Sequence, residues 1–130
     1  MKPLEISIVI NGLIEKATIS ICTKENIMTF EMVDGTSKSY FTDDFFQGLG
    51  ELRTDFPHIK FLCKGSKLNV YPSSMASQMS KGLVAYEVQM GTPADSDRIV
   101  HTFDYEEKDI CATIQEQREF RKRWMASLNK

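Results

Sequence analysis

The chain has 130 residues, of which 42% are hydrophobic, 26% charged and 10% aromatic, and its formal net charge is −2. These values predict a single globular domain over residues 1–130 and exclude intrinsic disorder, because enough apolar surface is present to form a core. No apolar run approaches the roughly 20 residues of a membrane helix, and the alternating N-terminus does not resemble a signal peptide. The slight acidic balance argues against a dedicated nucleic-acid-binding protein.

Residues 1–57 predict an antiparallel meander of four strands. Apolar and polar residues alternate with the period of two that is typical of a half-buried strand. Two hairpin dipeptides, Asn11-Gly12 and Asp34-Gly35, separate such stretches. The expected strands are Leu4 to Ile10, Ala17 to Ile21, Met28 to Met32 and a short one that ends near Tyr40-Phe41.

A helix is expected next. Thr42-Asp43-Asp44 supplies an N-cap and first-turn acids, and Pro57 marks the end of the helix. Between them, one apolar stripe has the spacing i, i+4, i+7 and i+11, which is typical of a helix packed on a core. Its members are Phe45, Leu49, Leu52 and Phe56.

Residues 58–130 repeat this order loosely. Alternating stretches predict strands over Ile59 to Lys64, Leu68 to Tyr71, Val84 to Met90 and Ile99 to Tyr105, with a loop from Thr92 to Asp97. A final helix carries Phe120, Trp124 and Leu128 on one stripe. We therefore expect an α+β fold with antiparallel sheet(s) in roughly two β-β-β-β-α units, with quasi-repeat halves of about 1–57 and 58–130 and the helices packed on the sheet.

No sequence motif for catalysis or for phosphate binding is present. The three cysteines, Cys22, Cys63 and Cys111, form no C-x-x-C pair, so we expect reduced thiols and a cytoplasmic location. His58 and His101 are the only histidines, and no metal-ligand spacing surrounds them. We therefore expect no enzymatic activity, no cofactor and no metal; a nucleophile at Cys63 or a catalytic His101 is the weaker alternative.

Charge is unevenly distributed. Residues 1–57 have five basic and nine acidic side chains, whereas residues 58–130 have eleven and nine. Acidic groups that could face a basic partner are Asp43, Asp44, Glu51 and Asp55 in the first helix region, and Asp104, Glu106, Glu107 and Asp109 in the second half. Basic residues gather in the last helix, at Arg118, Arg121, Lys122, Arg123 and the terminal Lys130. Each charge is individually explained by solvent exposure, or by the helix dipole in the last helix.

The segment Pro72 to Gly82 is rich in serine and methionine. Ser73 or Ser74 can cap one or two helical turns that place Met75 and Met79 on the same side. Methionine either fills a gap in a core or forms an adaptable contact surface. Core filling is the more common use, whereas an exposed pair would mark a partner site.

The stretch from Phe61 to Phe103 resembles immunity proteins of contact-dependent growth inhibition and related bacterial polymorphic-toxin systems. The residues that carry the resemblance are Cys63-x-Gly65, Asn69-x-Tyr71-Pro72-Ser73, Met75, Met79, Gly82-x-x-x-Tyr86, Gly91-x-Pro93 and Phe103. Separately, the order of elements resembles the Whirly architecture of single-stranded nucleic-acid binders. Architecture alone assigns no function.

This resemblance implies a protein that neutralises a cognate toxin domain, often a nuclease, by protein–protein contact. Such a protein needs no catalytic group, and acidic residues would steer it to a cationic toxin. The alternative is a single-stranded nucleic-acid-binding module that uses the basic last helix with Lys60, Lys64 and Lys67. A second copy of the chain is another candidate partner, through the edge of the first strand.

Overall fold

The first half of the chain folds as the predicted meander in this computed structural model, which describes residues 2–93 and 98–128. Consecutive strands pair antiparallel, and Asn11 and Gly12 connect the first two with φ values of 52° and 78°. Both values lie in the left-handed region that this tight hairpin turn requires. The four strands are β1 (Lys2–Ile10), β2 (Leu13–Cys22), β3 (Ile27–Met32) and β4 (Ser37–Phe41).

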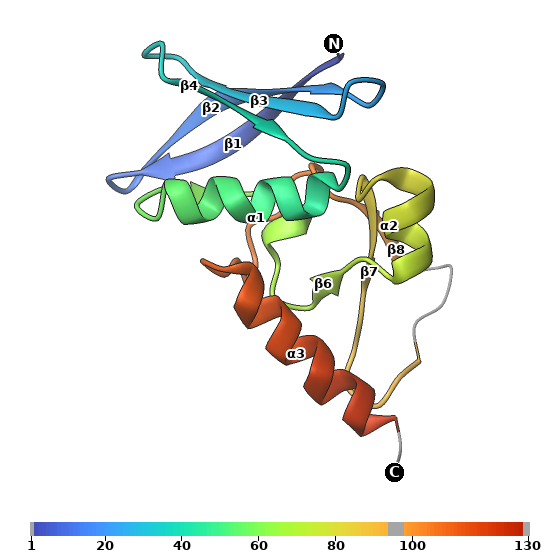
Figure 1. Cartoon of the computed structure of the whole chain (residues 1–130). Helices are drawn as coiled ribbons and strands as arrows, with labels where there is room; N and C mark the ends of the chain where they lie inside the picture. Colours follow the sequence, from blue (N-terminus) through green and yellow to red (C-terminus); the bar gives the residue numbers. More distant parts are fainter. Residues whose placement is uncertain (1, 94–97, 129–130) are drawn as a thin grey trace.

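Helix α1 (Phe45–Asp55) covers one face of this sheet (Figure 1). The N-cap is Asp44 itself, so the expectation that Asp43 and Asp44 are first-turn acids is wrong and no acidic residue lies in the first turn. Phe56 follows the last turn directly before Pro57, as the sequence predicts. Phe45, Leu49 and Leu52 are fully buried. Together with Phe56, which is partly buried, they pack on a core formed by the sheet side chains Ile6, Ile8, Ala17, Ile19, Ile21, Met28, Phe30 and Tyr40.

The second half also has four strands and a final helix, but its strands are short and two other helical elements interrupt them. In chain order the elements are β5 (Lys60–Phe61), the 3₁₀-helix η1 (Lys64–Ser66), β6 (Val70–Tyr71), α2 (Ser74–Ser80), β7 (Val84–Glu87), β8 (Ile99–His101) and α3 (Ile114–Ser127). β5 pairs with β1 and completes a five-stranded sheet of order β4-β3-β2-β1-β5, whereas β6, β7 and β8 form a second sheet. The α+β class with antiparallel sheets is therefore confirmed. The Whirly-like arrangement stays a prediction.

Three expected strands end earlier than the alternation predicts, and one of them is the strand from Val84, which ends at Glu87 instead of Met90. The strand from Ile59 stops at Phe61, because the chain turns into η1 and Gly65 donates its N–H to Thr102 O at 2.8 Å. The strand from Ile99 stops at His101, and Phe103 turns into the main core. Residues 94–97 of the loop predicted from Thr92 to Asp97 lie outside the described residues, as does the terminal Lys130.

Helix α1 lies between the five-stranded sheet and the rest of the second half (Figure 1). α3 lies on the far side, with Trp124 buried and Phe120 partly buried. Leu128, the third member of the apolar stripe expected on this helix, is 36% exposed because the helix ends at Ser127. The buried residue that the stripe did not include is Gln117.

Candidate protein-interaction surface

Met75 and Met79 lie on the surface. They belong to α2, which begins after the N-cap Ser73, whose hydroxyl accepts a hydrogen bond from Ala76 N at 3.0 Å. Their exposed fractions are 69% and 81%, and no residue of α2 is buried. The core-filling use of this pair is therefore wrong, and the exposed arrangement, which was expected to mark a partner site, is the one observed.

Helix α2 is fixed to the start of α1 by Asp44. One carboxylate oxygen of Asp44 accepts hydrogen bonds from Phe46 N and Gln47 N at 3.0 and 3.1 Å, and the other accepts one from the Ser77 hydroxyl. Phe45 N also donates to Lys81 O at 2.6 Å. Asp44 therefore holds the helix that presents the methionines, and its carboxylate oxygens are already engaged within the chain.

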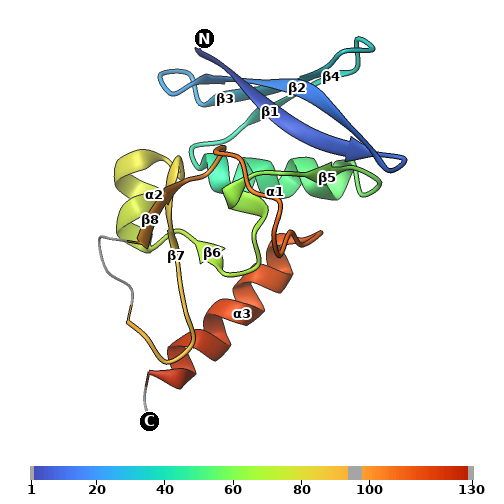
Figure 2. The same cartoon turned by 180° about the vertical axis from the view of Figure 1, so that it is seen from behind.

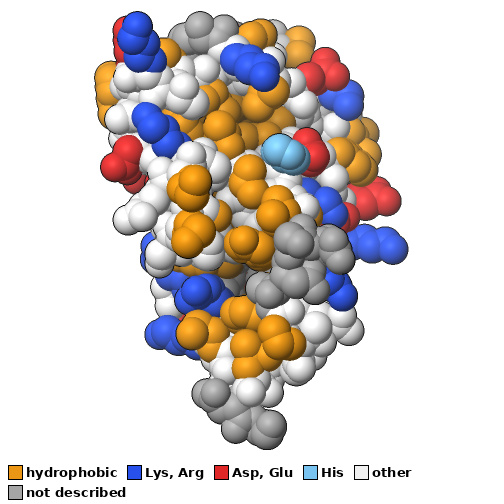
Figure 3. Space-filling view, turned by 90° about the vertical axis from the view of Figure 1, so that its right-hand side faces the viewer, with side chains coloured by type: hydrophobic (Ala, Val, Ile, Leu, Met, Phe, Trp, Pro, Cys, Tyr) orange, Lys and Arg blue, Asp and Glu red, His pale blue; other side chains and the backbone are white. Residues whose placement is uncertain are grey.

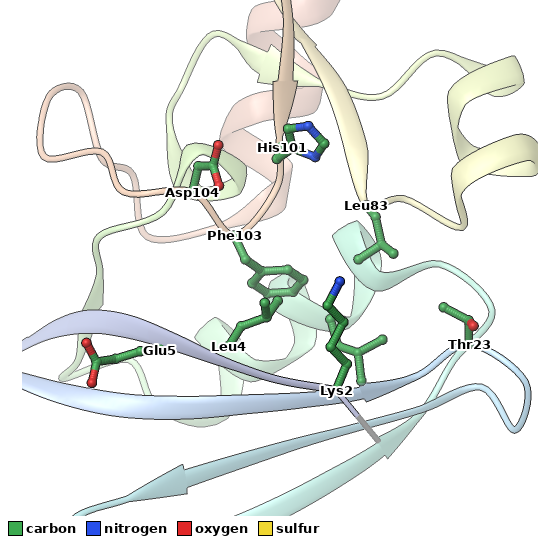
Figure 4. Close-up of a pocket in the computed structure, with 9 residues that line it drawn as sticks. Lys2, Leu4, Glu5, Thr23, Leu83, His101, Phe103 and Asp104 are labelled. Atoms are coloured by element: carbon green, nitrogen blue, oxygen red, sulfur yellow. The ribbon is translucent and has the colours of Figure 1, made fainter.

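A cavity of about 380 Å³ lies between β1, the end of β2 and the segment that follows β8 (Figure 4). Figure 4 shows Phe103 lying close to Leu4, whereas the carboxylate of Glu5 points away from them. The other polar residues that contribute to the lining are Lys2, Thr23, His101 and Asp104, and the apolar ones are Leu4, Ile21, Leu83 and Phe103. The cavity therefore offers an apolar floor with charged groups of both signs around it.

Helix α2 adjoins this cavity, because Leu83, which lines the cavity, donates its N–H to Ser80 O of α2 at 3.1 Å. Figure 3 shows the molecule from the side of α2, with apolar side chains spread from the five-stranded sheet down to the second half of the chain. Ile99 lies two residues before His101 on β8, so its side chain, which is 44% exposed, is on the same face of the strand as His101, which lines the cavity. We call this surface the apolar face; its residues are Met75, Met79 and Ile99 together with Leu4, Ile21, Leu83 and Phe103 from the cavity.

Two further candidate acids are engaged within the fold. Asp55 accepts a hydrogen bond from the Tyr40 hydroxyl at 2.7 Å and pairs with Lys38 at 2.9 Å. These contacts hold the pKa of Asp55 below its ordinary value. Burial, assisted by Asp55, raises the pKa of Tyr40.

Glu106 lies in a four-membered charge network. It pairs with Lys67 at 2.9 Å and Lys64 at 3.0 Å, and Glu87 contacts the same two lysines at 3.5 and 3.2 Å. The hydrogen bond from Lys67 is the main reason why the pKa of Glu106 falls from about 4.5 to about 2. Glu106 therefore ties the segment after β8 to η1 and β7.

The remaining candidate acids, Asp43, Glu51, Asp104, Glu107 and Asp109, are exposed. They come from two parts of the chain, the region of α1 and the segment between β8 and α3. Asp43 is next to Asp44, which contacts α2, and Asp104 lines the apolar cavity, so these two lie beside the apolar face. Glu51 belongs to α1, whereas Glu107 and Asp109 lie in the segment between β8 and α3.

Four of the basic groups proposed for nucleic acid, Lys64, Lys67, Arg118 and Arg121, are also engaged within the fold. Lys64 and Lys67 face Glu87 and Glu106. Arg118 of α3 donates to Gln47 Oε1 at 3.0 Å and to the Tyr71 hydroxyl at 3.3 Å. The guanidinium of Arg121 lies 5.5 Å from the centre of the Tyr71 ring. These contacts weigh against a continuous phosphate-binding face.

Cys63 has the properties of a core residue. Its side chain is fully buried, and burial raises the pKa of the thiol to about 12. Because the thiolate is the nucleophilic form, this environment is unfavourable for nucleophilic chemistry. His101 is exposed and lines the apolar cavity. Among the described residues, no three His, Cys, Asp or Glu side chains are grouped so as to hold a metal ion.

A buried polar pair was missed by the sequence analysis. Arg53 is 3% exposed and Gln117 is 1% exposed, and Arg53 Nη2 donates to Gln117 Oε1 at 2.6 Å. The available signal was spacing, since Gln117 lies three residues before Phe120 and seven before Trp124, on the same side of α3. Its polar side chain excluded it from a stripe defined by apolar residues.

Comparison with protein-family models and with curated proteins finds no match to the chain. The resemblance to immunity proteins therefore stays a prediction that rests on the residues themselves. Within residues 2–93 and 98–128, no helix has the length and apolar character needed to cross a membrane.

Proposed function

We propose that this protein is an immunity protein that binds a cognate bacterial toxin domain in the cytoplasm and neutralises it by protein–protein contact. The observation that carries the proposal is the exposed methionine pair beside an apolar cavity. Apolar groups gathered on one side of a monomer are typical of protein-binding sites, and methionine adapts to the shape of a partner.

The position of this face in the sequence supports the same proposal. The segment Phe61–Phe103 carries the resemblance to immunity proteins and also supplies Met75, Met79, Leu83, Ile99 and Phe103 of the apolar face. The apolar face and the family resemblance therefore come from one part of the chain and share Met75, Met79 and Phe103.

Electrostatics supports a basic partner. Asp43 and Asp104, which lie beside the apolar face, are exposed and form no ion pair within the described part of the chain. Carboxylates around an apolar contact accelerate encounter with a cationic protein and favour it over acidic competitors. A nuclease domain, whose substrate site is positively charged, has this character.

The test is co-expression with the toxin domain encoded immediately upstream, together with calorimetry on the purified pair. Met79→Glu should weaken binding at least tenfold, because a charge would be buried in an apolar contact. Val33→Glu is the matched control, since Val33 is 82% exposed and Met79 is 81% exposed, and Val33 lies between β3 and β4. It should leave binding unchanged.

Three results would contradict the proposal: unimpeded toxicity on co-expression, absence of a complex, or equal effects of the two substitutions. Steeply salt-dependent binding of a single-stranded oligonucleotide would instead support the alternative function, because phosphate neutralisation releases counterions.

A further inference from the structure

Arg53 is a buried cation without an acidic partner. Its side chain lies in the second half of α1, and no carboxylate among residues 2–93 and 98–128 forms an ion pair with it. Nη1 donates to Cys111 O at 3.2 Å and Nη2 donates to Gln117 Oε1 at 2.6 Å. Nε is buried and has no hydrogen-bond acceptor. All the acceptors that Arg53 contacts are neutral.

Such an arrangement is costly for the protein. A buried charge loses its hydration, and neutral acceptors replace only part of that stabilisation. Burial accordingly lowers the pKa of Arg53. Glu116 acts on Arg53 only through space, and its carboxylate accepts a hydrogen bond from the Thr113 hydroxyl at 3.1 Å.

A second cavity adjoins this arginine. Its volume is about 310 Å³, and it lies between the last turns of α1, the segment that leads into β5 and the residues before α3. Figure 2 shows α1 and β5 from behind. Arg53 and Cys111 form part of its wall, and the exposed side chains of His58 and Lys60 also line it. None of the described residues around it is acidic. Three nitrogen-bearing side chains therefore surround a space that contains no carboxylate.

This cavity is separate from the apolar face. α1 contacts α2 through Asp44, at its N-cap, whereas Arg53 lies in the last turn of α1. The inference therefore does not rest on the proposed function, and each can fail without the other.

We propose that this second cavity is a binding site for a small oxyanion, a carboxylate or a phosphate group, with Arg53 as the central cation and with Lys60 and His58 at the rim. A guanidinium matches the planar, paired acceptors of both groups. Lys60 adds a positive charge, and His58 can donate from a ring N–H. The bound anion would supply the negative charge that Arg53 lacks among the described residues.

The experiment is an NMR titration of the ¹⁵N-labelled full chain, which follows the Arg53 Nε–H signal. Inorganic phosphate and acetate are added separately, with sodium chloride adjusted to hold the ionic strength constant. A saturable shift with either anion is expected. Saturation by phosphate alone would identify a phosphate source for the ligand, and saturation by acetate alone would identify a carboxylate source.

Variants at the rim of the cavity distinguish a loss of anion binding from a loss of folding. Lys60→Ala and His58→Ala remove exposed side chains and leave the hydrogen bonds of Arg53 intact. Lys60→Ala should weaken anion binding about fivefold, which is the loss expected when one partly exposed charge contact is removed. Lys24→Ala is the matched control, because Lys24 is also exposed but does not line the cavity. The inference is overturned by a signal that does not saturate with either anion, or by rim variants that bind as the control does.

Discussion

Arg53 Nη2 and Gln117 Oε1 are joined by a 2.6 Å hydrogen bond between two side chains that are almost completely buried. The same Gln117 donates through Nε2 to Gly65 O and Lys67 O at 2.9 Å and to Val70 O at 3.2 Å. A single glutamine thus connects α1, η1, β6 and α3. This contact holds the second half of the chain against α1.

Replacing Gln117 with leucine should therefore be strongly destabilising. The substitution keeps the volume but removes the hydrogen-bond partner of Arg53 Nη2 and of several carbonyl groups, which we expect to cost about 3 kcal/mol. The measurement is the free energy of unfolding from urea denaturation. Gln115→Leu, at an exposed position of the same helix, should change it by less than about 0.5 kcal/mol. Equal effects would mean that the network contributes little.

Gly82 should tolerate no side chain. Its φ is +76°, and a Cβ atom there would lie 2.1 Å from Asp44 Oδ1 and 2.7 Å from Phe46 N. Gly91 has almost the same φ, +77°, but open space around it. Gly91→Ala should cost only the backbone strain, about 1 kcal/mol, whereas Gly82→Ala should also disrupt the N-cap of α1 and cost at least twice as much. Thermal denaturation of both variants separates the two contributions.

Glu106 should make stability depend on pH in the acidic range. Because its pKa in the folded protein is lowered to about 2, its stabilising contribution is complete above its ordinary pKa, near 4.5, and is lost as the pH falls toward 2. Glu106→Gln should therefore destabilise the protein at pH 7 by about 1 kcal/mol, and the difference from the original protein should shrink below pH 4.

The control for that experiment is Glu107→Gln, which changes an exposed carboxylate outside the lysine network. Its unfolding free energy should follow that of the original protein at every pH. A constant difference between Glu106→Gln and the original protein from pH 7 to pH 2 would contradict the assigned role.

Cys63 should react more slowly with thiol reagents than the other two cysteines. It is fully buried and the pKa of its thiol is about 12, whereas Cys22 and Cys111 are partly exposed. We expect Cys22 and Cys111 to be modified first at pH 8, with Cys63 modified only after unfolding. Mass spectrometry of peptides after timed alkylation measures this order. Early modification of Cys63 in the folded protein would contradict it.

The sequence by itself determined the local features of the fold. Alternation, the Asn11-Gly12 turn and the capping signal in Thr42-Asp43-Asp44 predict β1 to β4 and α1, because each depends on residues close together in the chain. The same reasoning predicted helical turns around Met75 and Met79.

Only the tertiary structure decided which surfaces are available. The exposure of Met75 and Met79, the engagement of Glu106 with two lysines and the burial of Arg53 beside Gln117 all depend on contacts between distant segments. Residues 53 and 117 are 64 positions apart, and no local periodicity links a charged residue to a neutral one over that distance. The helix at residues 74–80 was therefore predictable, whereas the exposure of its methionines depends on how α2 is attached to α1.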